Sequence, residues 1–311
     1  MCTTYSEKNS KKRKTVIAHR GASGYLPEHT IEAKIMAHGI NVDFIEQDLV
    51  LSKDDVPIVI HDIYLDDVTD VATKFKGRNR EDGRYYVIDF TLRELKKLKV
   101  SERFNPKTKK QVYPNRFPKN TGNFRLSTLE EEIEIIKALN KTMDKNIGIY
   151  PEIKAPKFHK NEGKDISKII LKTLEKHGYN SKNDNCILQC FDSEELERIR
   201  KELNSNLFLV QLMESEGEVK KLSHFASYAN GIGPWYKQIV RKKNGKYVFS
   251  ELVKKAHELN LVVHPYTLRA DNLGGFNSFE ELLGVLLFDA NVDGAFTDFP
   301  DKMVKFLDAN N

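Results

Sequence analysis

The stretch from Val16 to Thr30 reads V-I-A-H-R-G-A-S-G-Y-L-P-E-H-T, an apolar run that ends at a histidine and an arginine. Parallel α/β folds keep their chemistry at the carboxyl ends of strands, which is where this run places His19 and Arg20. An imidazole can move a proton near neutral pH, and a guanidinium offers a fork of donors that fits a phosphate. The stretch therefore predicts a parallel α/β fold with a polar site at its strand ends.

A second stretch, from Phe44 to Asp62, reads F-I-E-Q-D-L-V-L-S-K-D-D-V-P-I-V-I-H-D. Glu46 and Asp48 lie two residues apart on the strand that it predicts, so both carboxylates leave the same face. Such a pair suits Ca²⁺ or Mg²⁺. A solvated strand face is the simpler alternative, but this strand is expected to be central, where two buried like charges need a counter-ion.

The second stretch must also fold back on itself. Only eight residues separate Asp48 from the next apolar run, which begins at Pro57. That spacing is too short for a parallel crossover, so it predicts a hairpin. With Asp54-Asp55 as the turn, Asp48 lies opposite His61. Two histidines, two carboxylates and an arginine are then expected to converge.

These motifs, H-R-G, P-E-H-T, E-x-D and V-I-H-D at this spacing, resemble those of the glycerophosphodiester phosphodiesterases. Further matches are P-E-I-K at 151–154, L-Q-C-F-D at 188–192, H-P-Y-T-L-R-A-D at 264–271 and D-G-A-F-T-D-F-P at 293–300. The resemblance covers roughly residues 15–307. It implies a barrel that hydrolyses glycerophosphodiesters, such as glycerophosphocholine and glycerophosphoethanolamine, to glycerol 3-phosphate and an alcohol. A divalent metal is implied as well, with Ca²⁺ the first expectation and Mg²⁺ the second.

Hydrophobic periodicity independently favours an α/β fold, the (β/α)₈ TIM barrel, over residues 15–311. Strands are expected near 16–19, 43–48, 147–152, 186–190, 207–212, 228–232, 261–266 and 293–297. Helices are expected near 30–39, 127–140, 164–177, 192–203, 216–226, 247–259, 278–288 and 300–309. Eight strands alternating with eight helices is the pattern of a closed barrel.

Residues 63–126 interrupt that alternation after the second strand. They are charged and rich in turn residues, with one short helix expected near 91–98. We interpret them as an inserted subdomain on the catalytic face, which caps the site and contacts the headgroup. The alternative is a solvated elaboration that only packs on the rim.

The composition is that of a protein with a sizeable core. The 311 residues are 40% hydrophobic, enough for one large barrel or two modest domains. A net charge of +5 is compatible with an anionic substrate but does not form the concentrated patch typical of nucleic-acid binding, so no nucleic-acid partner is expected. No run of 18 apolar residues is present to predict a membrane span.

Residues 1–14 are polar and are expected to form a disordered tether. Cys2 suggests an acylated lipoprotein cysteine, which would tether the protein to a membrane in the periplasm or cell envelope. An accidental cysteine in a cytoplasmic tail is the alternative, and the frequent export of the family favours the envelope. Cys186 and Cys190 are too far apart on one strand for a disulfide, so core packing is expected of both. The sequence leaves the oligomeric state open, with a homodimer as one alternative.

The resemblance gives these residues roles. His19 and His61 are expected to act as the acid/base pair. Glu152, at the end of another strand, joins Glu46 and Asp48 as the third metal ligand. Substrate contacts are expected from Arg20, Lys154, Gln189, Phe191, Trp235, Tyr266 and Arg269.

Some of those contacts have simpler readings. Trp235 forms either a wall for glycerol or choline, or a core residue that anchors its loop. Arg269 engages phosphate or only pairs with Asp271. His29 is expected to cap or orient the first helix. Two other functions compete: a phospholipase D- or sphingomyelinase D-like enzyme that acts on intact lipid, and a surface binding protein or adhesin built on the same barrel.

Overall fold

The computed structural model describes residues 13–243 and 245–310, so Cys2 and most of the predicted tether lie outside the described residues. Eight parallel strands follow one another in a nine-stranded sheet in the order β11, β1, β2, β4, β5, β6, β7, β10, which is also their order along the chain after β11, and the ninth strand, β3 (Pro57–Val59), pairs with β2. The strands are β1 (Thr15–Ala18), β2 (Phe44–Leu51), β4 (Gly148–Ile153), β5 (Ile187–Cys190), β6 (Phe208–Met213), β7 (Gly231–Pro234), β10 (Val262–Val263) and β11 (Gly294–Thr297).

The sheet closes into a barrel through irregular backbone pairing between its two ends. Phe296 donates its N–H to the carbonyl of Pro265 at 3.0 Å, and Leu268 donates to Phe296 at 2.8 Å. This pairing replaces a full seventh strand, since β10 is shorter than the strand predicted at 261–266. The predicted (β/α)₈ barrel is confirmed.

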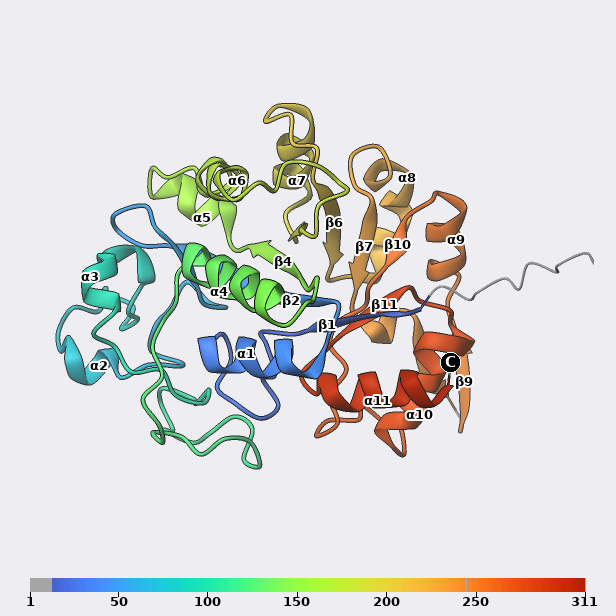
Figure 1. Ribbon diagram of the computed structural model, residues 1–311, viewed down its shortest axis with the longest axis horizontal. Coiled ribbons are helices and arrows are strands. Elements are labelled where there is room, and N and C mark those ends of the chain that lie inside the picture. Colours follow the sequence, from blue (N-terminus) through green and yellow to red (C-terminus); the bar gives the residue numbers. More distant parts are fainter. Residues whose placement is uncertain (1–12, 244, 311) are drawn as a thin grey trace, which may run out of the picture.

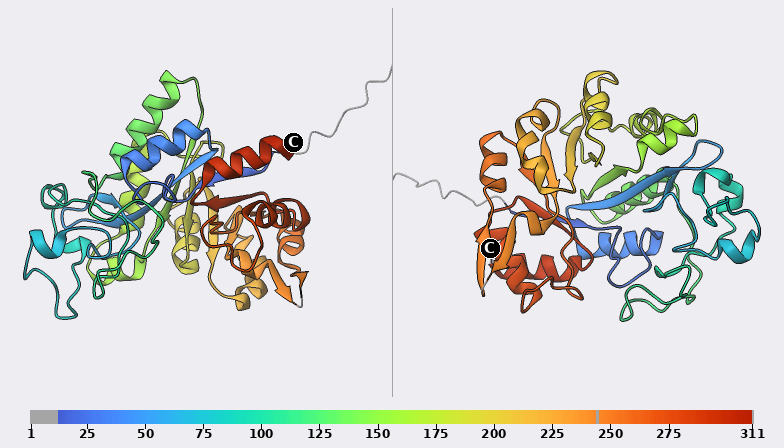
Figure 2. Two further views of the ribbon diagram at one scale, coloured as in Figure 1. Left: turned by 90° about the horizontal axis from the view of Figure 1, so that it is seen from below. Right: turned by 180° about the vertical axis from the view of Figure 1, so that it is seen from behind.

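Helices surround the strands on the outside (Figures 1 and 2). They are α1 (Ile31–Ile40), α4 (Leu129–Thr142), α5 (Pro156–Asn161), α6 (Ile166–Lys176), α7 (Ser193–Lys201), α8 (Leu222–Phe225), α9 (Leu252–Glu258), α10 (Phe279–Gly284) and α11 (Pro300–Asn310). A 3₁₀ segment, Glu216–Lys221, precedes α8, and a π-helical turn, Val285–Asp289, extends α10. Among the described residues, no helix has the length and apolar character needed to cross a bilayer.

The helix predicted at 247–259 is wrong in its first part. Residues Val240–Lys243 and Lys246–Phe249 form an antiparallel hairpin, β8 and β9, and α9 begins only at Leu252. Gly245 has a φ of 75°, the left-handed backbone that a tight hairpin turn requires. The sequence prediction also missed α5, which lies between β4 and α6.

The turn after β1 depends on Gly21. Its φ is 86°, and a Cβ atom there would lie 2.8 Å from the backbone carbonyl of Ala33 in α1. Only glycine therefore lets the chain pass so close to the helix. Arg20, with a φ of 58°, is also in the left-handed region, and this turn directs its backbone N–H to Glu46.

The β2 hairpin forms as predicted, but its register differs by one residue. Strand β3 (Pro57–Val59) pairs antiparallel with β2, and Ile60 donates its N–H to the carbonyl of Asp48 at 2.9 Å. Asp48 therefore lies opposite Ile60 and not His61. The reason is a three-residue loop that ends at Asp55, with a φ of 63°, in place of the two-residue turn expected.

Residues 63–126 pack around a hydrophobic cluster of their own. It joins Ile58 and Ile60 of the hairpin to buried side chains of the insertion such as Leu65, Phe90 and Leu98. The insertion contains α2 (Val71–Lys74), a 3₁₀ turn (Val87–Asp89) and α3 (Leu92–Leu95). In Figure 1 it lies at the left end of the molecule, coloured cyan to green, and α11 lies at the opposite end.

One carboxyl group in the insertion is poorly matched to its surroundings. Glu102 is 3% exposed, and its Oε2 lacks a hydrogen-bond partner. Burial, and next to it the charge of Glu28, raise the pKa of Glu102 to about 8. Because the folded protein holds this proton more tightly than the unfolded chain, the resulting stabilisation is complete below about pH 4.5 and is lost as the pH rises through 8.

We therefore expect Glu102→Gln to leave the free energy of unfolding nearly unchanged at pH 5 and to raise it by about 1–3 kcal/mol at pH 8.5, where the parent must bury a charge. Urea denaturation at both pH values measures the difference. An equal change at the two pH values would show that the charge of Glu102 has no part in stability.

Candidate active site

All the sequence-predicted site residues line one cavity at the carboxyl ends of the strands. Its volume is about 210 Å³. The predicted residues on its wall are His19, Arg20, Glu46, Asp48, His61, Glu152, Lys154, Gln189, Phe191, Trp235, Tyr266 and Arg269. The structure thus brings the predicted set together, and their individual roles stay predictions.

Each of the two histidines is held by a carboxylate at its Nδ1. Nδ1 of His19 lies 2.5 Å from Asp298 Oδ1, and Nδ1 of His61 lies 2.8 Å from Asp62 Oδ1. A carboxylate at Nδ1 favours the tautomer that carries its proton there and leaves Nε2 able to accept one. Burial, and next to it the charge of Arg20, lower the pKa of both histidines to about 4. Both imidazoles are therefore neutral near pH 7.

Three carboxylates line the same cavity as the two histidines. Glu46, Asp48 and Glu152 each offer an oxygen, and these oxygens all lie within 4.8 Å of one another. Burial, and then the repulsion of the neighbouring carboxylates, raise the pKa of Glu46. Burial likewise raises the pKa of Glu152 to about 8. Asp48 Oδ1 is buried without a hydrogen-bond partner. Hard oxygen atoms, crowded like charges and an unpaired buried oxygen fit a divalent cation.

Neighbouring side chains fix the orientation of these carboxylates. His29 Nε2 lies 2.7 Å from Asp48 Oδ2, and the amide of Gln189 donates to Glu46 Oε1 at 3.0 Å. Of the two roles expected of His29, capping is wrong, because Thr30 caps α1, whereas an orienting role stays a prediction, with His29 Nδ1 3.2 Å from Nζ of Lys34 in α1. Gln189 holds a carboxylate on the cavity wall, which sequence reasoning had not anticipated.

Two cations face the same cavity. Arg20 Nη1 lies 3.0 Å from both carboxylate oxygens of Glu28, and Lys154 Nζ lies 2.7 Å from Glu152 Oε1. Both side chains are close enough to the three carboxylates for an anion bound there to meet positive charge. Arg269 pairs with Asp298 at 2.7 Å. The pairing of Arg269 with Asp271 considered from sequence is therefore wrong.

Aromatic rings form the outer rim. Phe191 is 37% exposed and Trp235 is 42% exposed, so the alternative that made Trp235 a core residue is wrong. Lys154 lies over the Phe191 ring, with Nζ 5.7 Å from its centroid, and Lys237 lies over Trp235 at 5.2 Å. Tyr266 packs edge-on against Phe191 and donates its hydroxyl to the carbonyl of Met213.

Several residues around the site were not identified from sequence. Glu28 and Asp298 lie within motifs that the sequence analysis quoted, P-E-H-T and D-G-A-F-T-D-F-P, so their neighbourhood was a usable signal. Arg103 and Arg116 belong to the irregular insertion, where no periodicity marks them. The residues of 63–126, all of which the structure describes, do not line the cavity, and this gives no support to the predicted capping role.

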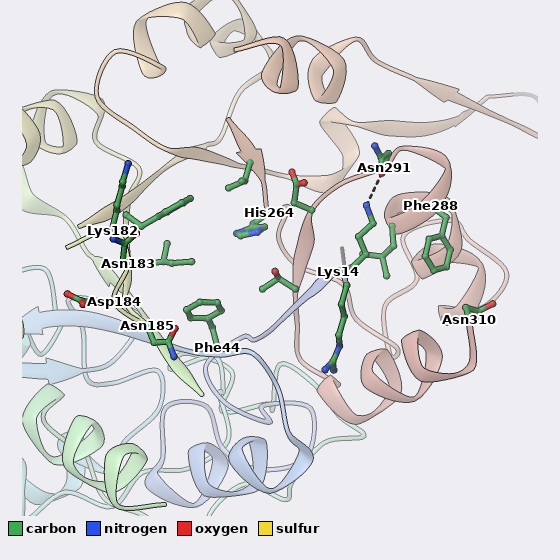
Figure 3. A pocket seen from close by; sticks show the side chains of 17 residues that line it. Lys14, Phe44, Lys182, Asn183, Asp184, Asn185, His264, Phe288, Asn291 and Asn310 are labelled. Carbon is green, nitrogen blue, oxygen red and sulfur yellow. Dashed lines mark hydrogen bonds between the residues drawn. The ribbon is translucent and has the colours of Figure 1, made fainter. Parts of the chain in front are cut away.

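A larger cavity of about 1090 Å³ lies at the opposite, amino-terminal mouth of the barrel (Figure 3). Its wall includes Phe44 and Val262, the first residues of β2 and β10, and Lys14, whose Nζ donates to Asn291 at 2.8 Å. A layer of buried side chains inside the barrel, including Tyr150 and Phe296, separates it from the candidate active site.

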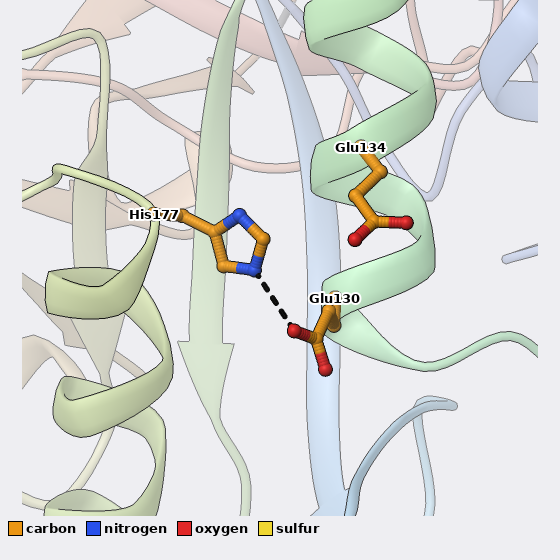
Figure 4. Close-up of side chains that lie close together, drawn as sticks. All are labelled: Glu130, Glu134 and His177. Atoms are coloured by element: carbon orange, nitrogen blue, oxygen red, sulfur yellow. Dashed lines mark hydrogen bonds and ion pairs between the residues drawn. The ribbon is translucent and has the colours of Figure 1, made fainter.

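A second group of possible metal ligands lies on the outside of the barrel. Glu130 and Glu134 of α4 approach His177 after α6, and His177 Nε2 lies 3.3 Å from Glu130 Oε1 (Figure 4). Lys176 already pairs with Glu130. This group is half exposed, and none of its residues lines the candidate active-site cavity.

The barrel, its paired histidines and its clustered carboxylates fit one class of protein, the phosphoric diester hydrolases, and a family model shows the same class. The model of the glycerophosphoryl diester phosphodiesterase family matches residues 19–302. The chain belongs to this family, as its motifs predicted.

Known relatives are similar in sequence to nearly the whole chain. A glycerophosphodiester phosphodiesterase of Haemophilus influenzae is 46% identical, over 96% of this chain and 90% of that protein. One from Treponema pallidum is 38% identical, over 94% and 91%. Among solved structures, a Silicibacter pomeroyi putative glycerophosphoryl diester phosphodiesterase has the same fold, with a TM-score of 0.73 and 22% identity, over 96% of this chain and 94% of that one. An Oleispira antarctica phosphodiesterase solved with the product sn-glycerol-3-phosphate has a TM-score of 0.66 and 20% identity, over 95% and 97%.

Proposed function

We propose that this protein hydrolyses glycerophosphodiesters, such as glycerophosphocholine and glycerophosphoethanolamine, to glycerol 3-phosphate and an alcohol. The observation that carries the proposal is the joint placement of two carboxylate-bound histidines and three clustered carboxylates in one small cavity. The names of the Haemophilus influenzae relative and the product held by the Oleispira antarctica enzyme support the same reaction.

Glu46, Asp48 and Glu152 would hold a divalent cation, Ca²⁺ by first expectation and Mg²⁺ by second. When bound, such a cation supplies Lewis-acid polarisation and lowers the pKa of a nearby hydroxyl. Arg20 and Lys154 offset the negative charge that accumulates on the phosphoryl oxygens.

The two histidines carry the protons. The negative charge of a bound diester favours the protonated imidazolium on one of the two histidines. The other, neutral histidine accepts at Nε2 the proton of the glycerol 2-hydroxyl as that oxygen bonds to phosphorus, and the imidazolium gives its Nε2 proton to the departing alcohol oxygen as the bond of that oxygen to phosphorus breaks. A five-membered cyclic phosphate results. Water then opens this ring with the two histidines in exchanged roles, which restores both to their starting protonation states and releases glycerol 3-phosphate.

The dimensions of the cavity favour a small diester over an intact lipid. A volume of about 210 Å³ accommodates a glycerophosphoryl group but no acyl chains. Each exposed ring on the rim already faces a lysine, which leaves little reason for a cationic headgroup to be preferred. We therefore expect headgroup tolerance, with turnover of the choline, ethanolamine and glycerol diesters within about tenfold of one another.

Release of glycerol 3-phosphate from these three diesters, before and after chelation and with Ca²⁺ and Mg²⁺ added back separately, tests the proposal. We expect activity to vanish with the chelator and to return with one of the two ions. Absence of activity on every diester with either ion would overturn the proposal and favour an intact lipid substrate or a binding role.

A further inference from the structure

An arginine of the insertion holds the carboxylate behind one histidine. Arg103 donates through Nη1 to Asp62 Oδ2 at 2.7 Å, and the other oxygen of Asp62 binds Nδ1 of His61. The same guanidinium also donates two hydrogen bonds to Glu28, from Nη2 to Oε1 at 2.6 Å and from Nε to Oε2 at 3.1 Å. The side chain of Arg103 is 16% exposed. A continuous chain of contacts thus runs from the insertion to His61.

A second arginine of the insertion does the same behind the other histidine. Arg116 donates through Nη2 to Asp298 Oδ2 at 2.6 Å, and Oδ1 of Asp298 binds Nδ1 of His19. Its Nε lies 2.7 Å from Asp271, and its guanidinium stacks on Tyr113 at 3.7 Å. Arg116 is therefore fixed on several sides and is nearly buried.

From this repeated arrangement we infer that the insertion supplies two positioning residues for the acid/base pair. Arg103 fixes the carboxylate of Asp62, which orients the imidazole of His61. Arg116 fixes the carboxylate of Asp298, which orients the imidazole of His19. The inference rests on the proposed function for its kinetic consequences. It assigns the insertion a place behind both histidines, since no side chain of residues 63–126 lines the cavity.

The physical reason is the geometry of a carboxylate. One oxygen of each aspartate accepts from the imidazole, and a charge-assisted bond to arginine at the other oxygen fixes the plane of the group. Without the arginine, the carboxylate rotates more freely and the imidazole loses its fixed direction. Groups that orient metal-bound histidines in the same way are typically worth 10–100-fold when removed, and we expect an effect of the same order here.

Replacement of the two arginines should lower kcat by different amounts. Asp298 Oδ2 accepts from Arg269 at 2.7 Å as well as from Arg116, whereas Arg103 supplies the one ion pair to Asp62 Oδ2 among the described residues. Loss of Arg116 is therefore partly compensated. We expect kcat to fall about 10–100-fold in Arg103→Met and less than tenfold in Arg116→Met, each with KM within about threefold of the parent.

A double-mutant cycle tests the route through Asp62. We expect Arg103→Met to cost at least threefold less in an Asp62→Asn background than alone, because the carboxylate through which Arg103 reaches His61 is already altered. Arg103→Lys should recover part of the loss, since an ammonium can still pair with one carboxylate. Arg84→Met is the matched control: this arginine also bridges two carboxylates of the insertion, Asp66 and Asp67, but touches neither histidine pair. Multiplicative effects in the cycle, or an equal loss in Arg84→Met, would overturn the inference.

A spectroscopic readout keeps the inference separate from the reaction. A histidine Nδ1 proton bonded to a carboxylate resonates far downfield in proton NMR, and variants of each histidine assign the two signals. Arg103→Met should remove or broaden the His61 signal alone, and Arg116→Met should affect the His19 signal alone. Unchanged signals in both variants would overturn the inference even in an active enzyme. If the parent protein has no diesterase activity but each arginine variant still changes only its own histidine signal, the proposed function is refuted and the positioning role of the arginines stands.

Discussion

Replacement of His61 by alanine is expected to lower kcat for glycerophosphodiester hydrolysis by about 10²- to 10⁴-fold, with little change in KM. Without a bound diester the imidazole is neutral near pH 7, because burial and the charge of Arg20 lower its pKa to about 4. Its Nδ1 is bound to Asp62, so Nε2 is the nitrogen left for proton transfer. Alanine removes that nitrogen and leaves the carboxylates and cations of the cavity in place.

His19→Ala should have an effect of the same order, because His19 carries the complementary proton. The double variant should lose far less than the product of the two single losses, since both groups serve the same step. Steady-state kinetics on glycerophosphocholine measure these effects. His224→Ala is a suitable control, because His224 lies on α8 and pairs with Glu197, away from the cavity. If either His19→Ala or His61→Ala keeps turnover within tenfold of the parent, the two-histidine mechanism is wrong.

The alternation of strands and helices was predictable because each barrel unit repeats the same burial pattern. A strand buried on both faces reads as a short apolar run, and each following helix has an apolar face and a cap, such as Thr128 before α4. The β8–β9 hairpin was missed because Tyr247 and its neighbours fit a helical pattern equally well. The register of the β2 hairpin was missed because it depends on the left-handed backbone of Asp55, which alternation does not reveal.

The cavity wall was predictable for the same local reason. Two-residue spacing places Glu46 and Asp48 on one face of β2, and the parallel register sets Glu152 of β4 directly beside Asp48. Arg103 and Arg116 were not predictable in this way. They come from an irregular segment, and their contacts with Asp62 and Asp298 depend on tertiary folding, since Arg116 and Asp298 are 182 positions apart in the sequence.

Replacement of Glu46 by glutamine is expected to lower turnover by about 10³-fold at limiting metal, because Lewis-acid stabilisation is worth several kcal/mol. Glutamine keeps the shape of the side chain but removes one of the three charges that would hold the cation. The backbone N–H of Arg20 donates to Oε2 of Glu46 at 2.9 Å, and it can donate in the same way to the amide oxygen of the glutamine. Gln189 has a buried Oε1 without a partner, and an amide flip lets this oxygen accept from the new N–H₂.

The same substitution should stabilise the metal-free protein. Burial and the nearby charges of Asp48 and Glu152 raise the pKa of Glu46, so a permanently neutral amide avoids the cost of bringing an ionisable carboxyl group into this site. We therefore expect two effects of opposite sign: a higher Tm without metal, and a smaller increase in Tm when Ca²⁺ or Mg²⁺ is added.

Calorimetric titration of each ion, with thermal unfolding in its presence and absence, measures both effects. Glu130→Gln is the matched control, because it removes a carboxylate from the exposed group on α4 that shares no residue with the cavity. It should change neither metal-dependent turnover nor the Tm shift. Parent-like metal affinity in Glu46→Gln, together with a loss in Glu130→Gln, would instead locate the cation on the outside of the barrel, and the three buried carboxylates would then require a different explanation.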